Sequence, residues 1–230
     1  MSNGQAKTST LAIVALVFAF ICMPVGLILG LVALIRINNS QGELGGRGLA
    51  IAAMIIPAAM VPVIGILAAI AVPNFVRYQL RSKEAEAKVN LRAILQSQRS
   101  FHDEHAFYAQ IPPSPSGAPS AIKQEWEARG CPAECSKDQP GSCGAFECVG
   151  FSPDLPVYFQ YSCSSSENGA GVLCAAVGDL DGDGKESVHL IGEGAGPDAL
   201  REPLPEIVRT ACRGKHWGDN ELVECTPNVF

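Results

Sequence analysis

The sequence is short of basic residues, histidine and aromatic residues, and these shortages limit the functions that it could serve. Its 230 residues include 17 Lys and Arg, 4 His and 7% aromatic residues. From Arg77 to the C-terminus, 14 basic residues stand against 22 acidic ones, a net charge of −8. Because nucleic acid binding requires a basic surface that matches the phosphates, we expect no nucleic acid partner.

Sequence motifs of catalysis are also missing. No glycine-rich phosphate loop follows a predicted strand, and no nucleophile elbow is present. The stretch "FHDEHAF" (101–107) places His102 and His105 three residues apart, but a metal site needs further ligands that the sequence does not supply. We interpret it as the polar end of a helix and predict a non-catalytic protein with no certain cofactor.

Charge is absent from two long segments, residues 11–35 and 48–76. A bilayer core requires about 20 helical residues. After an N-terminal tail (1–10) we therefore predict spans at 11–35 and 49–75, which form a two-helix membrane domain over 11–60. Cys22 is expected to be a small buried apolar residue of the first span. A hairpin of two spans would place both ends of the chain on the same side, with the lipid bilayer as partner.

The remaining eight cysteines lie in the polar part of the chain, and their even number in a loop-rich region predicts four disulfides. They are Cys131, Cys135, Cys143, Cys148, Cys163, Cys174, Cys212 and Cys225. Zinc is the rival, but neither "CPAEC" nor "CGAFEC" is a C-x-x-C pair. Disulfides require an oxidising compartment, whereas the basic residues that follow the second span favour a cytoplasmic tail. We give the predicted disulfides more weight than the basic residues. We therefore expect a protein anchored in the bacterial inner membrane, with its C-terminal domain in the periplasm or outside the cell.

The polar part of the chain predicts an α+β fold. Apolar residues recur at helical spacing after the second span, which indicates one continuous helix over 49–106. Its stripe consists of Val76, Leu80, Ala87, Leu91, Ile94 and Phe101, with Gln98 as the one polar gap. A Cys-rich loop region (111–150) follows, with a short helix in 120–128. Strands at 157–163, 171–180 and 187–193, separated by turn sequences, predict an antiparallel sheet, and the tail (194–230) would wrap it.

The stretch "GILAAIAVPNFVRYQLRSKEAEAKVNLRAI" (65–94) resembles the N-terminal helix of bacterial type IV pilins and of related secretion subunits. Gly65 matches the helix glycine of that family, and Pro73, Asn74 and Phe75 match its kink motif. The resemblance implies a long membrane-embedded spine helix that carries an extracytoplasmic antiparallel head. It therefore supports a pilin-like domain over 61–230 and an outside location for the head.

The upstream residues depart from the pilin pattern. At the family's spacing, the cleavage glycine falls on Ile51 and the buried acidic residue on Ile56. Residues 8–60 instead resemble a two-helix bacterial membrane domain of unknown function, with "LGGRGLAIA" (44–52) leading into its second helix. In pilins, as the resemblance implies, the buried carboxylate pairs with the free amino terminus of a neighbouring subunit. We expect a fusion of the two domains that lacks this pair and therefore enters filaments less readily.

The segment "DLDGDGKES" (179–187) contains the sharpest local motif. Asp179, Asp181 and Asp183 alternate as in the first half of a calcium-binding EF-hand loop, but the position of the closing Glu is occupied by Leu190. Calcium binding and a plain Asp-Gly hairpin turn are both open, and the missing ligand favours the turn.

The sequence therefore predicts a membrane-anchored, pilin-like structural protein, whose partners would be other pilin-like subunits or their assembly machinery. The alternative is a non-assembling, membrane-tethered binding or sensing module. A calcium-dependent adhesin head is a third hypothesis.

Overall fold

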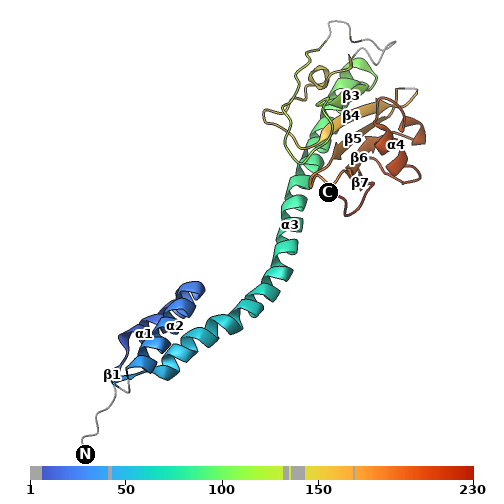
Figure 1. Ribbon diagram of the computed structural model, residues 1–230. Helices are drawn as coiled ribbons and strands as arrows, with labels where there is room; N and C mark the ends of the chain where they lie inside the picture. Colours follow the sequence, from blue (N-terminus) through green and yellow to red (C-terminus); the bar gives the residue numbers. More distant parts are fainter. Residues whose placement is uncertain (1–6, 41–42, 132–134, 136–142, 168) are drawn as a thin grey trace, which may run out of the picture. The chain divides into compact units, whose positions relative to one another are not determined.

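The computed structural model describes residues 7–40, 43–131, 135, 143–167 and 169–230. The chain divides into two compact units, Met1–Phe75 and Val76–Phe230, which are described separately below. Helix α3 (Arg47–His105) contributes its first part to one unit and its second part to the other (Figure 1).

The first unit begins with two short helices, α1 (Thr10–Ile21) and α2 (Met23–Asn39). The prediction of one continuous helix over 11–35 is wrong, because Cys22 leaves the helical conformation (φ −143°). Pro24 explains the break, since proline suits the first turn of a new helix but lacks the N–H that a continuing helix needs. Cys22 was predicted to be buried, yet it is an exposed free thiol at this break.

Small residues lie where the helices of the first unit meet. Ala12, Ala33 and Ala50 form one buried cluster with Ile37, and Ala15, Ala19 and Ala53 form another, so α1, α2 and the start of α3 pack together. Gly26 allows the close approach of α1 and α2, because a Cβ there would lie 2.4 Å from the backbone of Ala19. The large apolar side chains of α1 and α2 point outward, which suits a lipid environment.

The N-terminal residues and the loop before α3 lie together. Strand β1 (Lys7–Thr8) pairs in parallel with β2 (Leu44–Gly45). Gly46 follows with φ +102°, a conformation that favours glycine, and its carbonyl accepts the first hydrogen bonds of α3. The ends of the α1–α2 hairpin are thereby joined.

In the second unit, the last part of α3 packs one face against a sheet. Leu80, Ala87, Leu91, Ile94 and Phe101 are all buried, as the helical stripe predicts. Val76 is an exception, because it is 44% exposed.

Gln98, the polar gap in the stripe, is fully buried and its side chain is fully engaged. Its Nε2 donates to the carbonyl of Ala109 and its Oε1 accepts from the N–H of Ala109, each at 3.0 Å. The polar gap therefore holds the chain that leaves the helix.

The sheet has five antiparallel strands in the order β3-β4-β5-β6-β7. They are β3 (Ile111–Ser114), β4 (Gln160–Ser165), β5 (Val172–Gly178), β6 (Ser187–Glu193) and β7 (Leu222–Glu224). The three central strands confirm the predicted antiparallel meander. The edge strands β3 and β7 were not predicted; β3 contains two prolines, which are tolerated only at a sheet edge.

The sheet is covered on both faces. Helix α3 covers one, and the other packs on α4 (Glu206–Ala211) and on Leu204. Two short 3-10 helices, η2 (Phe146–Val149) and η3 (Pro197–Ala199), complete the elements. The helix predicted in 120–128 is not formed; Gln124 instead makes an isolated β-bridge with Val157.

The eight predicted cysteines form four disulfides. Cys131 bonds to Cys148 and Cys135 to Cys143 in the loop region, Cys163 links β4 to Cys174 of β5, and Cys212 links the end of α4 to Cys225. The α+β prediction, with disulfide-rich loops around an antiparallel sheet, is confirmed.

Candidate functional site

Helix α3 exposes a long apolar surface. Every residue from 58 to 79 is exposed, including Ile66 (65%), Leu67 (61%) and Phe75 (61%). The most apolar part of α3 is almost entirely unburied within the chain. Among the described residues, α3 is the one helix long and apolar enough to cross a membrane. A surface of this kind requires lipid or another protein to cover it.

Pro73 and Asn74 lie within this exposed stretch, and α3 continues through them. Because proline lacks an N–H, the carbonyl of Ala69 does not receive the hydrogen bond that residue 73 would donate in a regular helix. One residue later, Asn74 Nδ2 donates to the carbonyl of Ile70 at 2.9 Å, which satisfies the polar side chain within the helix. A polar group in lipid needs such an internal partner. The kink at Pro73 stays a prediction.

Gly65 has no neighbour that would exclude a side chain. A Cβ at this position would meet nothing within 4 Å. A glycine inside a helix costs about 1 kcal/mol relative to alanine. Packing within the single chain therefore does not explain the glycine, and its predicted role in shaping the spine remains untested.

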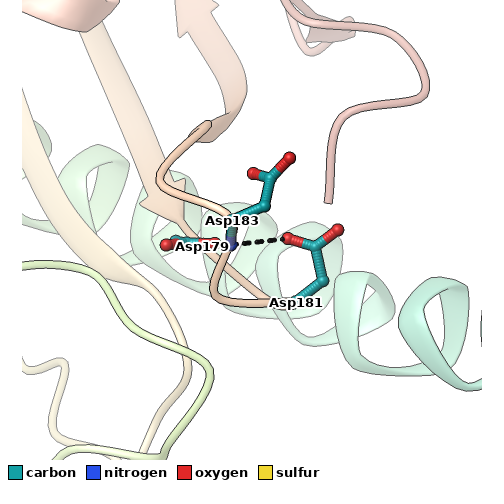
Figure 2. A group of neighbouring side chains, drawn as sticks. All are labelled: Asp179, Asp181 and Asp183. Atoms are coloured by element: carbon teal, nitrogen blue, oxygen red, sulfur yellow. Dashed lines mark hydrogen bonds between the residues drawn. The ribbon is translucent and has the colours of Figure 1, made fainter.

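The three aspartates form a tight turn between β5 and β6 (Figure 2). One carboxylate oxygen from each of the three residues lies within 4.8 Å of those of the other two. Asp179, which is buried, accepts hydrogen bonds from the N–H groups of Gly182 (2.8 Å) and Gly184 (3.1 Å), and Asp181 accepts one from Asp183 N–H (3.2 Å).

Asp183, the third carboxylate of the turn, already has a cation. The ammonium of Lys185 lies 2.9 Å from it, and this hydrogen bond lowers the pKa of Asp183. Leu190, at the position of the missing closing ligand, is buried in the core. The carboxylates thus stabilise the turn itself, and calcium remains a prediction that these contacts do not favour.

The helix end at His102 and His105 is aromatic in character. His105 stacks on Phe101 with ring centroids 4.2 Å apart, and His102 stacks on Tyr108 at 4.3 Å. These contacts support the interpretation of the pair as a helix end. In the part of the chain that the structure describes, the aspartates of the turn are the one group of three or more potential ligands close enough to hold a metal.

A buried polar cluster was not predicted. His189 of β6 is fully buried; its Nε2 lies 3.1 Å from Ser187 Oγ and 3.6 Å from Glu84 Oε1, while Glu84 pairs with Lys88 at 2.6 Å. Burial lowers the pKa of His189 to about 4, although the nearby Glu84 raises it and Lys88 lowers it further. A histidine in this state is neutral and structural at pH 7.

One stretch of the chain is similar in sequence to a known protein. The chain is 52% identical over 52 residues to the type IV major pilin protein PilA of Myxococcus xanthus (strain DK1622). Part of this chain is pilin-like. The match covers 23% of this chain and 24% of the pilin, so it spans about a quarter of that relative's length. No family model and no solved structure matches.

The pilin-like similarity and the long apolar helix together fit a membrane-anchored protein. Four disulfides stabilise the second unit, which includes the last part of this helix. Gly65, Pro73, Asn74 and Phe75 all lie on this helix, and their role as a structural motif stays a prediction. No sequence signal pointed to the His189 cluster, because its members lie about 100 residues apart in the chain.

Proposed function

We propose that this chain is a membrane-anchored, pilin-like structural protein whose second unit is an extracytoplasmic head. The observation that carries the proposal is the uninterrupted exposure of residues 58–79 on a helix that continues into the disulfide-stabilised unit. The similarity to a type IV major pilin supports it. The function is structural and needs no catalytic group.

The membrane topology that we propose has one span. Helices α1 and α2 have 12 and 17 residues, and the last turn of α2 contains the polar residues Arg36, Asn38 and Asn39. At 1.5 Å per residue, α1 is about 18 Å long, too short for a hydrocarbon core of about 30 Å. The α1–α2 hairpin therefore enters and leaves the membrane on one side, and α3 alone crosses it.

This topology resolves the conflict between cysteines and basic residues. The β1–β2 pairing holds Lys7 beside the segment that joins α2, which contains Arg36, to α3, which begins at Arg47. One crossing by α3 then leaves these basic residues in the cytoplasm and the disulfides in an oxidising compartment. The prediction that both chain ends share one side is replaced by opposite sides.

Alkaline phosphatase fusions test the topology, because this reporter requires disulfides and is active only in an oxidising compartment. A fusion after Phe230 should be active, and an insertion in the loop between α2 and α3 (residues 40–46) should be inactive. Activity of the loop insertion would contradict the single span.

The alternative function is a membrane-tethered module that does not assemble. Ala50 and Ala53 of α3 are completely buried against α1 and α2, so a neighbouring subunit cannot pack there while the hairpin is attached. Neither Ile51 nor Ile56 supplies the residue that the pilin pattern has at its position.

N-terminal sequencing of protein recovered from native membranes separates the two functions. A terminus within 48–56 would show that the hairpin is removed and that α3 is free to pack in a filament. An intact hairpin would support the tethered module.

A further inference from the structure

A cavity of about 430 Å³ opens in the second unit, beside α4. Its polar wall carries the side chains of Arg209, Arg213, Lys215 and His216, and its apolar wall includes Leu200 and Trp217. Ligand pockets for small molecules range from roughly 300 to 1,000 Å³ and combine apolar walls with a few polar groups. The cavity matches both features.

The cavity concentrates positive charge in a region whose net charge is −8. No acidic residue lines it. Among the described residues, no ion pair joins Arg209, Arg213 or Lys215 to a carboxylate, whereas Arg99, Arg129 and Arg201 each have one. Three cations without a counter-charge repel one another, and an anion would relieve that repulsion.

The buried part of Arg209 strengthens this argument. Its Nε is inaccessible to solvent and has no hydrogen-bond partner among the described residues. An unsatisfied buried donor is costly, and the cost is greater for a charged group. Arg209 lies on α4 and Arg213 in the turn that follows it, and both side chains line the cavity. A guanidinium presents its N–H donors in a planar fork, which can bind two oxygens of a carboxylate or of a phosphate.

The walls are held in place before any ligand binds. Cys212 caps the C-terminus of α4 and forms a disulfide with Cys225. The N–H of Cys225 donates to the carbonyl of Val188 of β6 at 2.8 Å. Trp217 is fixed because its Nε1 donates to the carbonyl of Ala195 at 3.0 Å. Preorganised walls reduce the entropy that a ligand loses on binding.

We propose that this cavity binds a compact organic oxyanion, a carboxylate or phosphate carried on a small ring. Arg209, Arg213 and Lys215 hold the oxyanion, and Trp217 with Leu200 contacts the ring. The proposal goes beyond the structural function above and does not depend on it, because every residue concerned lies in the second unit.

Calorimetric titration of the full-length protein in detergent micelles tests the proposal with three sugars that share one ring. Glucuronate carries a carboxylate, glucose 6-phosphate carries a phosphate, and glucose carries neither. We expect saturable binding of at least one charged sugar with a Kd below about 1 mM and none of glucose. The charged sugar that binds identifies the oxyanion.

Variants locate the site. Arg213→Gln, at an exposed position, should weaken binding about tenfold, the size expected for losing a charged hydrogen bond. The matched control is Arg129→Gln, which removes the same charge from an exposed arginine outside the cavity and should leave Kd within about twofold. Trp217→Leu should weaken binding of the charged sugar but not of inorganic phosphate or acetate. Unchanged melting temperatures would show that the variants fold.

Three results would overturn the proposal. The first is that neither charged sugar binds. The second is that Arg129→Gln weakens binding as much as Arg213→Gln, which would indicate diffuse attraction. The third is that inorganic phosphate and acetate bind as tightly as the sugars, which would exclude a contribution from the ring.

Discussion

Replacement of His189 by glutamine should remove a large part of the pH dependence of stability. His189 of β6 is fully buried. Its ring lies beside Ser187 and beside Glu84 of α3, which pairs with Lys88. Glu224 of β7 is its cross-strand partner. Burial lowers its pKa to about 4, against 6.5 for an ordinary histidine. The unfolded chain therefore binds a proton at a pH where the folded chain does not.

The sign and size follow from this difference. Because the folded pKa of His189 is lowered, its contribution to stability is complete above pH 6.5 and is lost as the pH falls toward 4. A difference of about 2.5 pKa units corresponds to about 3 kcal/mol, at 1.36 kcal/mol per unit. The free energy of unfolding should fall by up to about 1.4 kcal/mol per pH unit in this window.

Urea unfolding of the full-length protein, with its disulfides intact and in detergent, measures this effect. Trp126 and Trp217 both lie in the second unit, so their fluorescence reports on it. Between pH 7 and 4.5 the wild type should lose about 2 to 3 kcal/mol more than His189→Gln, because the carboxylates titrate in both proteins and cancel.

The control is His216→Gln, which removes an exposed histidine and should retain the wild-type pH dependence. Equal losses of stability in the wild type and in His189→Gln would refute the reasoning, since burial would then not hold the ring neutral.

Three further predictions concern other contacts of the second unit. Gln98→Leu should lower the free energy of unfolding by about 2 to 4 kcal/mol in urea titrations, because the buried N–H and C=O of Ala109 lose their partners; a loss below about 0.5 kcal/mol would mean that water replaces the amide. Joint replacement of Cys212 and Cys225 by alanine should lower the free energy of unfolding by about 3 kcal/mol, the size expected for the 13-residue separation that the disulfide closes, relative to the wild type with all four disulfides intact. Calcium should shift the melting temperature no more than magnesium; a calcium-specific shift that Asp181→Ala abolishes would instead establish a site in the turn.

The sequence predicted the second unit well where side-chain periodicity is strong. From Leu80 to Phe101, apolar residues recur every three or four positions and charged or polar residues lie between them. This helical period is visible in the sequence, and the buried face follows from it. Even the polar gap at Gln98 was located, although its partner Ala109 could be found only once the chain had turned back.

The break in the first unit had no periodic signal. Residues 11–35 are apolar on every side, so no face distinguishes one helix from two, and a single proline at position 24 is tolerated in many membrane helices. The close approach of Gly26 to Ala19 decides in favour of a hairpin, and that contact is tertiary.

The His189 cluster and the cavity beside α4 also depend on distant residues. Glu84 and His189 are brought together by the packing of α3 on the sheet. The cavity takes its basic wall from the segment around α4 and its apolar wall partly from Leu200, and none of these short pieces forms a motif. Both features belong to the topology and have no local pattern.

The two units bury opposite kinds of side chain, and this contrast argues most directly for their different surroundings. In the first unit, alanines such as Ala12 and Ala53 are completely buried while Phe20 (66%) and Ile21 (75%) are exposed. In the second unit, large side chains such as Phe159 and Tyr161 are completely or almost completely buried. In lipid, the hydrophobic effect does not favour the burial of large apolar side chains, and helices associate through small residues that allow close packing. In water, the hydrophobic effect favours the burial of large apolar side chains. The burial pattern of the first unit suits lipid, and that of the second unit suits water.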